Sequence, residues 1–135
     1  MLLDTGPLVA FRNPADSQHQ ICIEMLGQIE PPLITSWSVM TEAAWMLRHD
    51  TEVVGRMFRG AAEGLFDIGH LTAEDLPAID ELRRRYADLS PQLADLTLLH
   101  LANRENLDTV FTLDQRDFRV FRAGRKSLRL LPGDE

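Results

Sequence analysis

Two acidic residues of this 135-residue chain directly follow predicted strands. Asp4 comes after the apolar residues 1–3, and Asp114 comes after the β-branched and aromatic stretch 109–113. In open α/β sheets, ligands bind at the edge where the carboxyl ends of the strands meet. The two carboxylates are therefore candidates for one site. A turn role is the alternative for each of them taken alone, because Asp commonly begins a turn.

Glu42 and Asp95 are predicted to lie on the apolar faces of helices. The residues three and four positions away are largely apolar: Val39, Trp45 and Met46 around Glu42, and Leu98 and Leu99 after Asp95. A carboxylate that faces a core is costly unless it is paired, protonated or bound to a cation. The alternatives are an edge position with solvent access for Glu42 and a favourable charge in the first helical turn for Asp95.

A bound cation is the simplest way to neutralise these four acids, because no set of basic residues is spaced to pair with all of them. Carboxylate oxygens without convergent Cys or His suit Mg²⁺ or Mn²⁺ better than Zn²⁺. Such an ion can clamp a phosphate, lower the pKa of a bound water and stabilise the charge that develops during in-line displacement. The pattern therefore favours phosphodiester hydrolysis.

Alternating strands and helices are predicted to position these acids in a parallel, helix-covered α/β sheet. Short apolar or β-branched runs predict strands at 1–3, 33–35, 66–68, 109–113 and 127–131. Apolar residues that recur every three or four positions predict helices at 15–29, 36–47, 51–65, 72–89 and 92–103. Residues 4–7 are expected to form a turn after the first strand.

Composition predicts one globular domain, residues 1–131, followed by a frayed tail at 132–135. The chain has 44% hydrophobic residues, and no apolar run approaches the roughly 20 residues needed to cross a bilayer. It contains one cysteine, Cys22, and no signal-like leader. We therefore expect a cytoplasmic protein without a membrane association.

The net charge of -7 argues against a general nucleic-acid coat protein, because backbone binding usually draws on a surplus of Lys and Arg. Residues 115–131 differ, with six basic residues against the single acid Asp117. The basic strip consists of Arg116, Arg119, Arg122, Arg125, Lys126 and Arg129. It is interpreted as a phosphate-contacting edge, a solvated charged loop or a docking surface for an acidic partner.

Segments around all four acids resemble the PIN-domain family, and within it the VapC-type toxin ribonucleases. These segments are 3–10 (LDTGPLVA), 41–43 (TEA), 93–95 (LAD) and 112–114 (TLD). The resemblance spans nearly the whole chain. It implies a three-layer α/β/α sandwich with a short, mainly parallel central sheet and Mg²⁺-dependent endonuclease activity on RNA, with Mn²⁺ as a substitute. It also implies a homodimer and a cognate antitoxin.

The resemblance further implies a role for each acid. Asp4 and Asp95 would be the principal metal ligands. Asp114 would be a further ligand or a water-positioning acid, and Glu42 a ligand or the general base. These assignments predict a catalytic site of four carboxylates, three of which hold the metal.

Three further residues match supporting positions of the family. Thr5 and Thr112 would hold the carboxylates by hydrogen bonding, although turn and strand preferences alone also explain these residue types. Asp117 would assist metal binding or cap the next turn, and the cap is favoured. Either Asp114 or Asp117 can serve as the fourth acid, and Asp114 is chosen because it directly ends a strand.

Two other functions remain open at this point. One is a housekeeping PIN nuclease for RNA processing or flap removal. The other is a non-catalytic RNA or protein interaction module on the same fold, which would agree with the acidic balance and the lack of a broad basic face.

Overall fold

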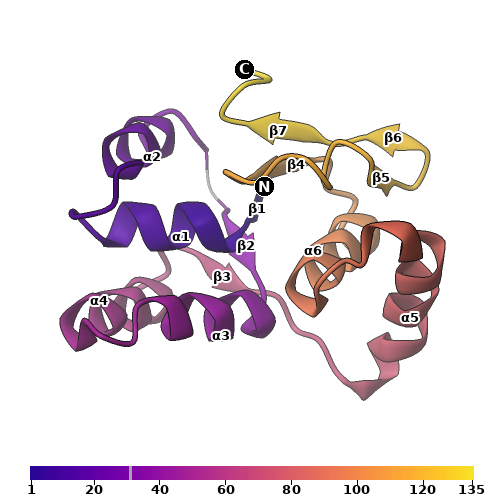
Figure 1. Cartoon of the computed structure of the whole chain (residues 1–135), viewed down its shortest axis with the longest axis horizontal. Helices are drawn as coiled ribbons and strands as arrows, with labels where there is room; N and C mark the ends of the chain where they lie inside the picture. The colour runs from indigo at the N-terminus through magenta and orange to yellow at the C-terminus, as the bar shows by residue number, and fades with distance from the viewer. Residues whose placement is uncertain (31) are drawn as a thin grey trace.

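Five short strands form a parallel sheet at the centre of the computed structural model, which describes residues 1–30 and 32–135 (Figure 1). The strands are β1 (Leu2–Leu3), β2 (Ile34–Thr35), β3 (Asp67–Ile68), β4 (Thr109–Phe111) and β7 (Arg129–Leu131). Their order is β3-β2-β1-β4-β7, and every neighbouring pair is parallel. The carboxyl ends of β1 and β4 therefore meet at the same edge of the sheet.

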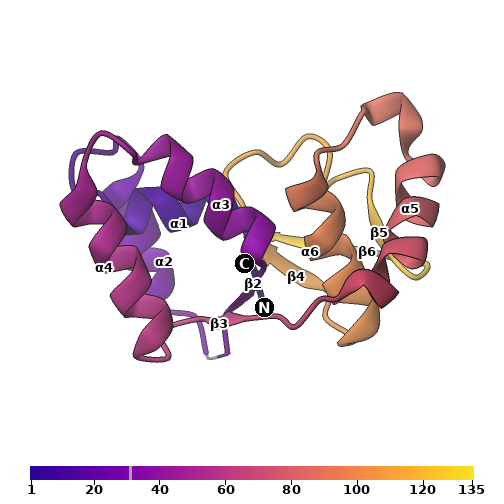
Figure 2. The ribbon, with the colours of Figure 1, turned by 90° about the horizontal axis from the view of Figure 1, so that it is seen from below.

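Helices cover both faces of the sheet, as parallel strands require because their connections must cross over. They are α1 (Thr5–Arg12), α2 (His19–Leu26), α3 (Trp37–Met46), α4 (Thr51–Ala62), α5 (Leu76–Arg85) and α6 (Leu93–Arg104). The first four lie on one side of the strands, and α5 and α6 lie on the other (Figures 1 and 2). The predicted three-layer α/β/α sandwich is confirmed.

The central strands and α6 form the core. Leu2, Leu3, Val110 and Phe111 are completely buried. Every residue of α6 from position 96 to position 102 is also buried, because this helix packs against the sheet, α3 and α5. A helix that is apolar on most of its surface is stable only in such a setting.

The first helix begins directly after Asp4, where the sequence predicted a turn. Asp4 is the extended N-cap residue of α1, and Pro7 lies in the first turn of the helix. Proline is tolerated there because the N–H groups of the first turn have no partner inside the helix. The turn signal of Gly6 and Pro7 is therefore a helix start, and α1 buries Leu8 against the core.

Two other segments differ from the predicted elements. The helix predicted at 72–89 consists of η1 (Ala73–Asp75), α5 and η2 (Ala87–Leu89). An antiparallel hairpin of β5 (Arg122–Ala123) and β6 (Lys126–Ser127) precedes β7. Gly124 in its turn has a φ of +64°, which glycine adopts without steric cost.

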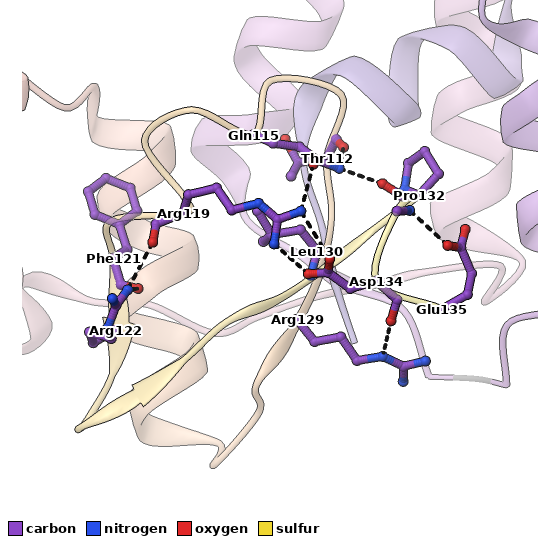
Figure 3. Close-up of polar contacts among 11 residues, drawn as sticks. Thr112, Gln115, Arg119, Phe121, Arg122, Arg129, Leu130, Pro132, Asp134 and Glu135 are labelled. Carbon is purple, nitrogen blue, oxygen red and sulfur yellow. Dashed lines mark hydrogen bonds and ion pairs between the residues drawn. The ribbon is translucent and has the colours of Figure 1, made fainter.

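Residues 132–135, for which fraying was predicted, fold back against β7. Asp134 accepts two hydrogen bonds from the Arg119 guanidinium, at 2.6 and 3.0 Å, and one from the Leu130 N–H at 2.8 Å (Figure 3). These bonds join residues that are far apart in the sequence, so local composition does not reveal them.

Among the described helices, none has the length and apolar character that a membrane crossing needs.

Candidate active site

A cavity of about 400 Å³ lies at the carboxyl edge of the sheet and is strongly acidic. Its lining includes every predicted acid: Asp4, Glu42, Asp95, Asp114 and Asp117. These residues come from the end of β1, from α3, from α6 and from the segment after β4. The fold therefore brings together side chains that are spread over more than 100 positions of the sequence.

Asp4 is the most buried acid of this cavity, with 7% of its surface exposed. Its N–H continues the β1–β4 pairing by binding the Phe111 carbonyl at 3.0 Å. The Thr112 hydroxyl donates to the Asp4 Oδ2 at 2.7 Å. Burial raises the pKa of Asp4, and the charges of Glu42 and Asp114 add to this rise while the Thr112 bond opposes it.

Asp95 lies in the first turn of α6 and is half-buried. Burial raises its pKa to about 7, and the negative charges of Asp4, Glu42 and Asp117 contribute to the increase. A carboxyl group with this pKa is about half protonated near neutral pH. Such perturbed groups cluster at functional sites because burial and like charges are brought together there.

Glu42 reaches the cavity from the edge of the buried face of α3. Its Oε2 accepts a hydrogen bond from the Thr5 hydroxyl at 2.8 Å. The prediction that Glu42 shares a buried helix face is wrong, because Trp45 and Met46 are 65% and 53% exposed. The buried face of α3 is formed instead by Val39, Met40 and Ala43. Glu42 therefore has the edge position with solvent access that was the alternative.

The segment after β4 contributes two more acids. Asp114 is exposed, and its N–H donates to the Thr112 hydroxyl at 3.2 Å. Asp117 is half-buried and accepts a bond from the Arg116 guanidinium at 3.4 Å. The backbone carbonyl of Asp117 closes the following turn, while its side chain lines the cavity. The backbone of Asp117, and not its side chain, therefore has the turn-capping role that the sequence favoured for this residue.

The two threonines make the hydrogen bonds that the resemblance implied. A further polar pair was not predicted: the hydroxyls of Ser36 and Thr97 are 2.8 Å apart and buried. Ser36 is the N-cap of α3, and Thr97 lies in α6. Their contact fixes the helix of Glu42 relative to the helix of Asp95. The sequence feature that could have revealed Thr97 is its hydroxyl-bearing side chain among the apolar residues of a buried helix.

The acidic residues of the cavity offer oxygen donors, which hard divalent cations prefer. In the described residues 1–30 and 32–135, the ion pairs include none with Asp4, Glu42 or Asp95. Over the same residues, no three Asp, Glu, His or Cys side chains already stand in an arrangement that could hold a metal ion. Within the described part of the chain, Asp4, Glu42 and Asp95 therefore line the cavity without an ion-pair partner, and this chemistry suits a cation such as Mg²⁺.

The parallel sheet, its two helical layers and the acidic cavity define a PIN-like α/β protein. No family model matches the chain. The sequence is 25% identical to ribonuclease VapC26 of Mycobacterium tuberculosis over 124 residues, which cover 90% of this chain and 92% of that relative. The fold is similar to the crystal structure of VapC20 from the same organism, described as a toxin that cleaves the sarcin–ricin loop. The TM-score is 0.79 at 16% identity, covering 90% of this chain and 96% of that one. The predicted resemblance to VapC-type PIN-domain proteins is confirmed.

Proposed function

We propose that this chain is a metal-dependent endoribonuclease and the toxin of a toxin–antitoxin pair. The observation that carries the proposal is the gathering of Asp4, Glu42, Asp95 and Asp114 at the carboxyl edge of the sheet. The similarity to a ribonuclease along nearly the whole chain supports RNA as the substrate. The similarity of the fold to that of a toxin that cleaves the sarcin–ricin loop supports the same proposal.

Asp4, Asp95 and Asp114 would hold Mg²⁺, or Mn²⁺ in its place. When bound, the cation would lower the pKa of a water and offset the charge that develops on the scissile phosphate. Because Asp95 has a pKa of about 7, it must lose a proton before its carboxylate can act as a full ligand. The proposal therefore predicts that cation binding weakens as the pH falls below neutrality.

The other residues of the site orient these acids. Thr112 keeps the Asp4 carboxylate in one orientation through its hydroxyl. Thr5 binds the Glu42 Oε2, so that the other carboxylate oxygen would accept a proton from the attacking water if Glu42 is the general base. If Glu42 is instead a ligand, the same hydrogen bond would fix its direction toward the cation.

RNA cleavage is tested by inducing the chain in cells and sequencing the newly formed RNA ends, beside the matched variant Asp4→Asn. This substitution removes one charge and nearly preserves the shape of the side chain. The expected result is a reproducible set of cut ends and growth arrest with the native chain, and neither with the variant. Identical ends from both proteins would exclude the assigned site.

Partner binding separates a toxin from a housekeeping nuclease. Large apolar side chains on α3 and α4 are exposed, including Trp37 (66%), Trp45 (65%) and Phe58 (54%), and protein partners commonly bury such groups. We propose an antitoxin and a second copy of the chain as these partners. A small antitoxin that copurifies and suppresses growth arrest would support the toxin. Light scattering on the purified chain measures its molar mass and so distinguishes a homodimer from a monomer.

A non-catalytic interaction module is the remaining alternative. It would bind RNA or protein through the same fold, with the acids in a structural role. This alternative predicts that neither Mg²⁺ nor Mn²⁺ binds the native chain and that incubated RNA stays intact.

A further inference from the structure

The segment that brings Thr112, Asp114 and Asp117 to the cavity is tied to residues 130–134 by side chains outside the cavity. The Gln115 amide Nε2 donates to the Pro132 carbonyl at 2.6 Å and lies 3.4 Å from the Thr112 carbonyl, which it also contacts as a donor. Gln115 therefore bridges the residue after β4 and the residue after β7 (Figure 3).

Arg119 extends this bridge to Asp134. Its Nη2 donates to the Gln115 Oε1 at 3.1 Å, and its two terminal nitrogens donate to both Asp134 carboxylate oxygens. Such a two-point contact fixes the relative orientation of the two planar groups as well as their distance. Asp134 is itself held in place, because its Oδ2 accepts the Leu130 N–H and its carbonyl accepts the Arg129 Nε, each at 2.8 Å (Figure 3).

These contacts form a continuous path from Asp134 through Arg119 and Gln115 to Thr112, whose hydroxyl binds Asp4. We propose that Asp134 and Arg119 are positioning residues for the acidic cavity, because they hold the segment 112–117 where Thr112 supports Asp4. This inference rests on the proposed function, since its catalytic consequence is the cleavage of RNA.

The path is suited to positioning more than to overall stability. The side chains of Arg119 and Asp134 are 47% and 32% exposed, and ion pairs at such sites contribute little to the free energy of folding. The buried Phe118 anchors one end of the segment in the core, and the backbone hydrogen bond from the Thr112 N–H to the Leu131 carbonyl anchors the other. Gln115, between these anchors, is held by Arg119. Loss of the path should therefore loosen the residues at the cavity while the core stays intact.

The test compares Asp134→Asn, Arg119→Met and the double variant with the native chain. The matched control is Glu135→Gln, because the Glu135 carboxylate accepts a bond only from Gly133 among the contacts described and does not touch Arg119. Steady-state cleavage of a fluorescent RNA gives kcat and KM separately. Hydrogen exchange of the Asp114 amide, which donates to the Thr112 hydroxyl, reports the order of the segment without any catalysis.

The expected result is a fall in kcat of about tenfold in both single variants, with KM unchanged. The double variant should show the same loss as either single one, because residues on one path are not additive. Exchange of the Asp114 amide should accelerate in all three, and the melting temperature and the control should match the native chain.

Native kcat and native Asp114 exchange in Asp134→Asn would overturn the proposal, as would fully additive losses in the double variant. A native chain that cleaves no RNA would contradict the proposed function instead. In that case the exchange of the Asp114 amide alone decides whether Asp134 positions the segment.

Discussion

The cavity has two halves that differ in how firmly their acids are held. The buried half contains Asp4, fixed by Thr112 at the end of β1, and Asp95, fixed in the first turn of α6. The open half contains Asp114, which is exposed, and Asp117, which pairs with the 88% exposed Arg116 side chain. The raised pKa values belong to Asp4 and Asp95. The free-energy cost of holding negative charges close together is thus greatest at Asp4 and Asp95, whose side chains are held most firmly. A cation that offsets these charges would bind there most strongly.

The largest expected effect comes from neutralising the buried half. Asp4→Asn and Asp95→Asn should each lower RNA cleavage on the order of 10³-fold, because acids that act as one unit fail together. Both variants should remain folded, since an amide fits the same space. Cleavage rates measured with a defined RNA check this, and full activity in either variant would show that the buried half is not the reaction centre.

A smaller loss is expected in the open half. Asp114→Asn should reduce cleavage about 10- to 100-fold, the usual range for a residue that supports a metal site. Asp117→Asn, the matched variant in the same segment, should cost less. The same cleavage assay compares the two, and a larger loss for Asp117→Asn would make Asp117 the fourth acid.

Removal of the hydroxyl that links the halves should have an intermediate effect on activity and a measurable effect on stability. Thr112→Val leaves the Asp4 carboxylate and the Asp114 N–H without this partner, so we expect a loss of about tenfold in kcat. The free energy of unfolding should fall by about 1–3 kcal/mol, because a buried bond is lost. Denaturant titration measures this change. Thr112→Ser keeps the hydroxyl and should restore most of both quantities; equal losses in Ser and Val would contradict the hydrogen-bond explanation.

The smallest expected effect is a dependence of stability on pH. Asp95 has a pKa of about 7 when folded and a reference value of 3.8, so the folded chain holds this proton more tightly than the unfolded chain. Its contribution to stability is therefore present below about pH 4 and is lost as the pH rises through 7. Without added metal, Asp95→Asn should melt a few degrees higher than the native chain at pH 8 and at nearly the same temperature at pH 4. Parallel melting curves at both pH values would mean that Asp95 is not perturbed.

The sequence predicted the sheet, and the placement of the strand-end acids at one edge of it, because both depend on local signals. The apolar run before Asp4 is β1, and the helix predicted at 36–47 is α3. Each acid that followed a strand, or opened a helix as Asp95 does, lines the cavity. Parallel pairing alone brings such positions to one edge, so the order of elements was sufficient.

The remaining features depend on contacts that no local pattern contains. The predicted direction of Glu42 is wrong because the apolar residue types near it, Trp45 and Met46, indicate a buried helix face, whereas both side chains are exposed. The sequence predicts a turn where α1 begins, because Gly6 and Pro7 are typical both of turns and of the first turn of a helix. The order of residues 132–135 depends on Arg119, fifteen positions before Asp134, and its two-point contact appears only in three dimensions.

Calorimetric titration with Mn²⁺ tests most directly whether the acidic cavity holds a cation. We expect the native chain to bind Mn²⁺ at pH 8 and to bind it more weakly at pH 5.5, because Asp95 is then protonated. Asp4→Asn and Asp95→Asn should abolish the heat of binding at both pH values, whereas Glu135→Gln should leave it unchanged. Equal Mn²⁺ binding by all four proteins, or no binding by the native chain, would contradict a cation site at these carboxylates.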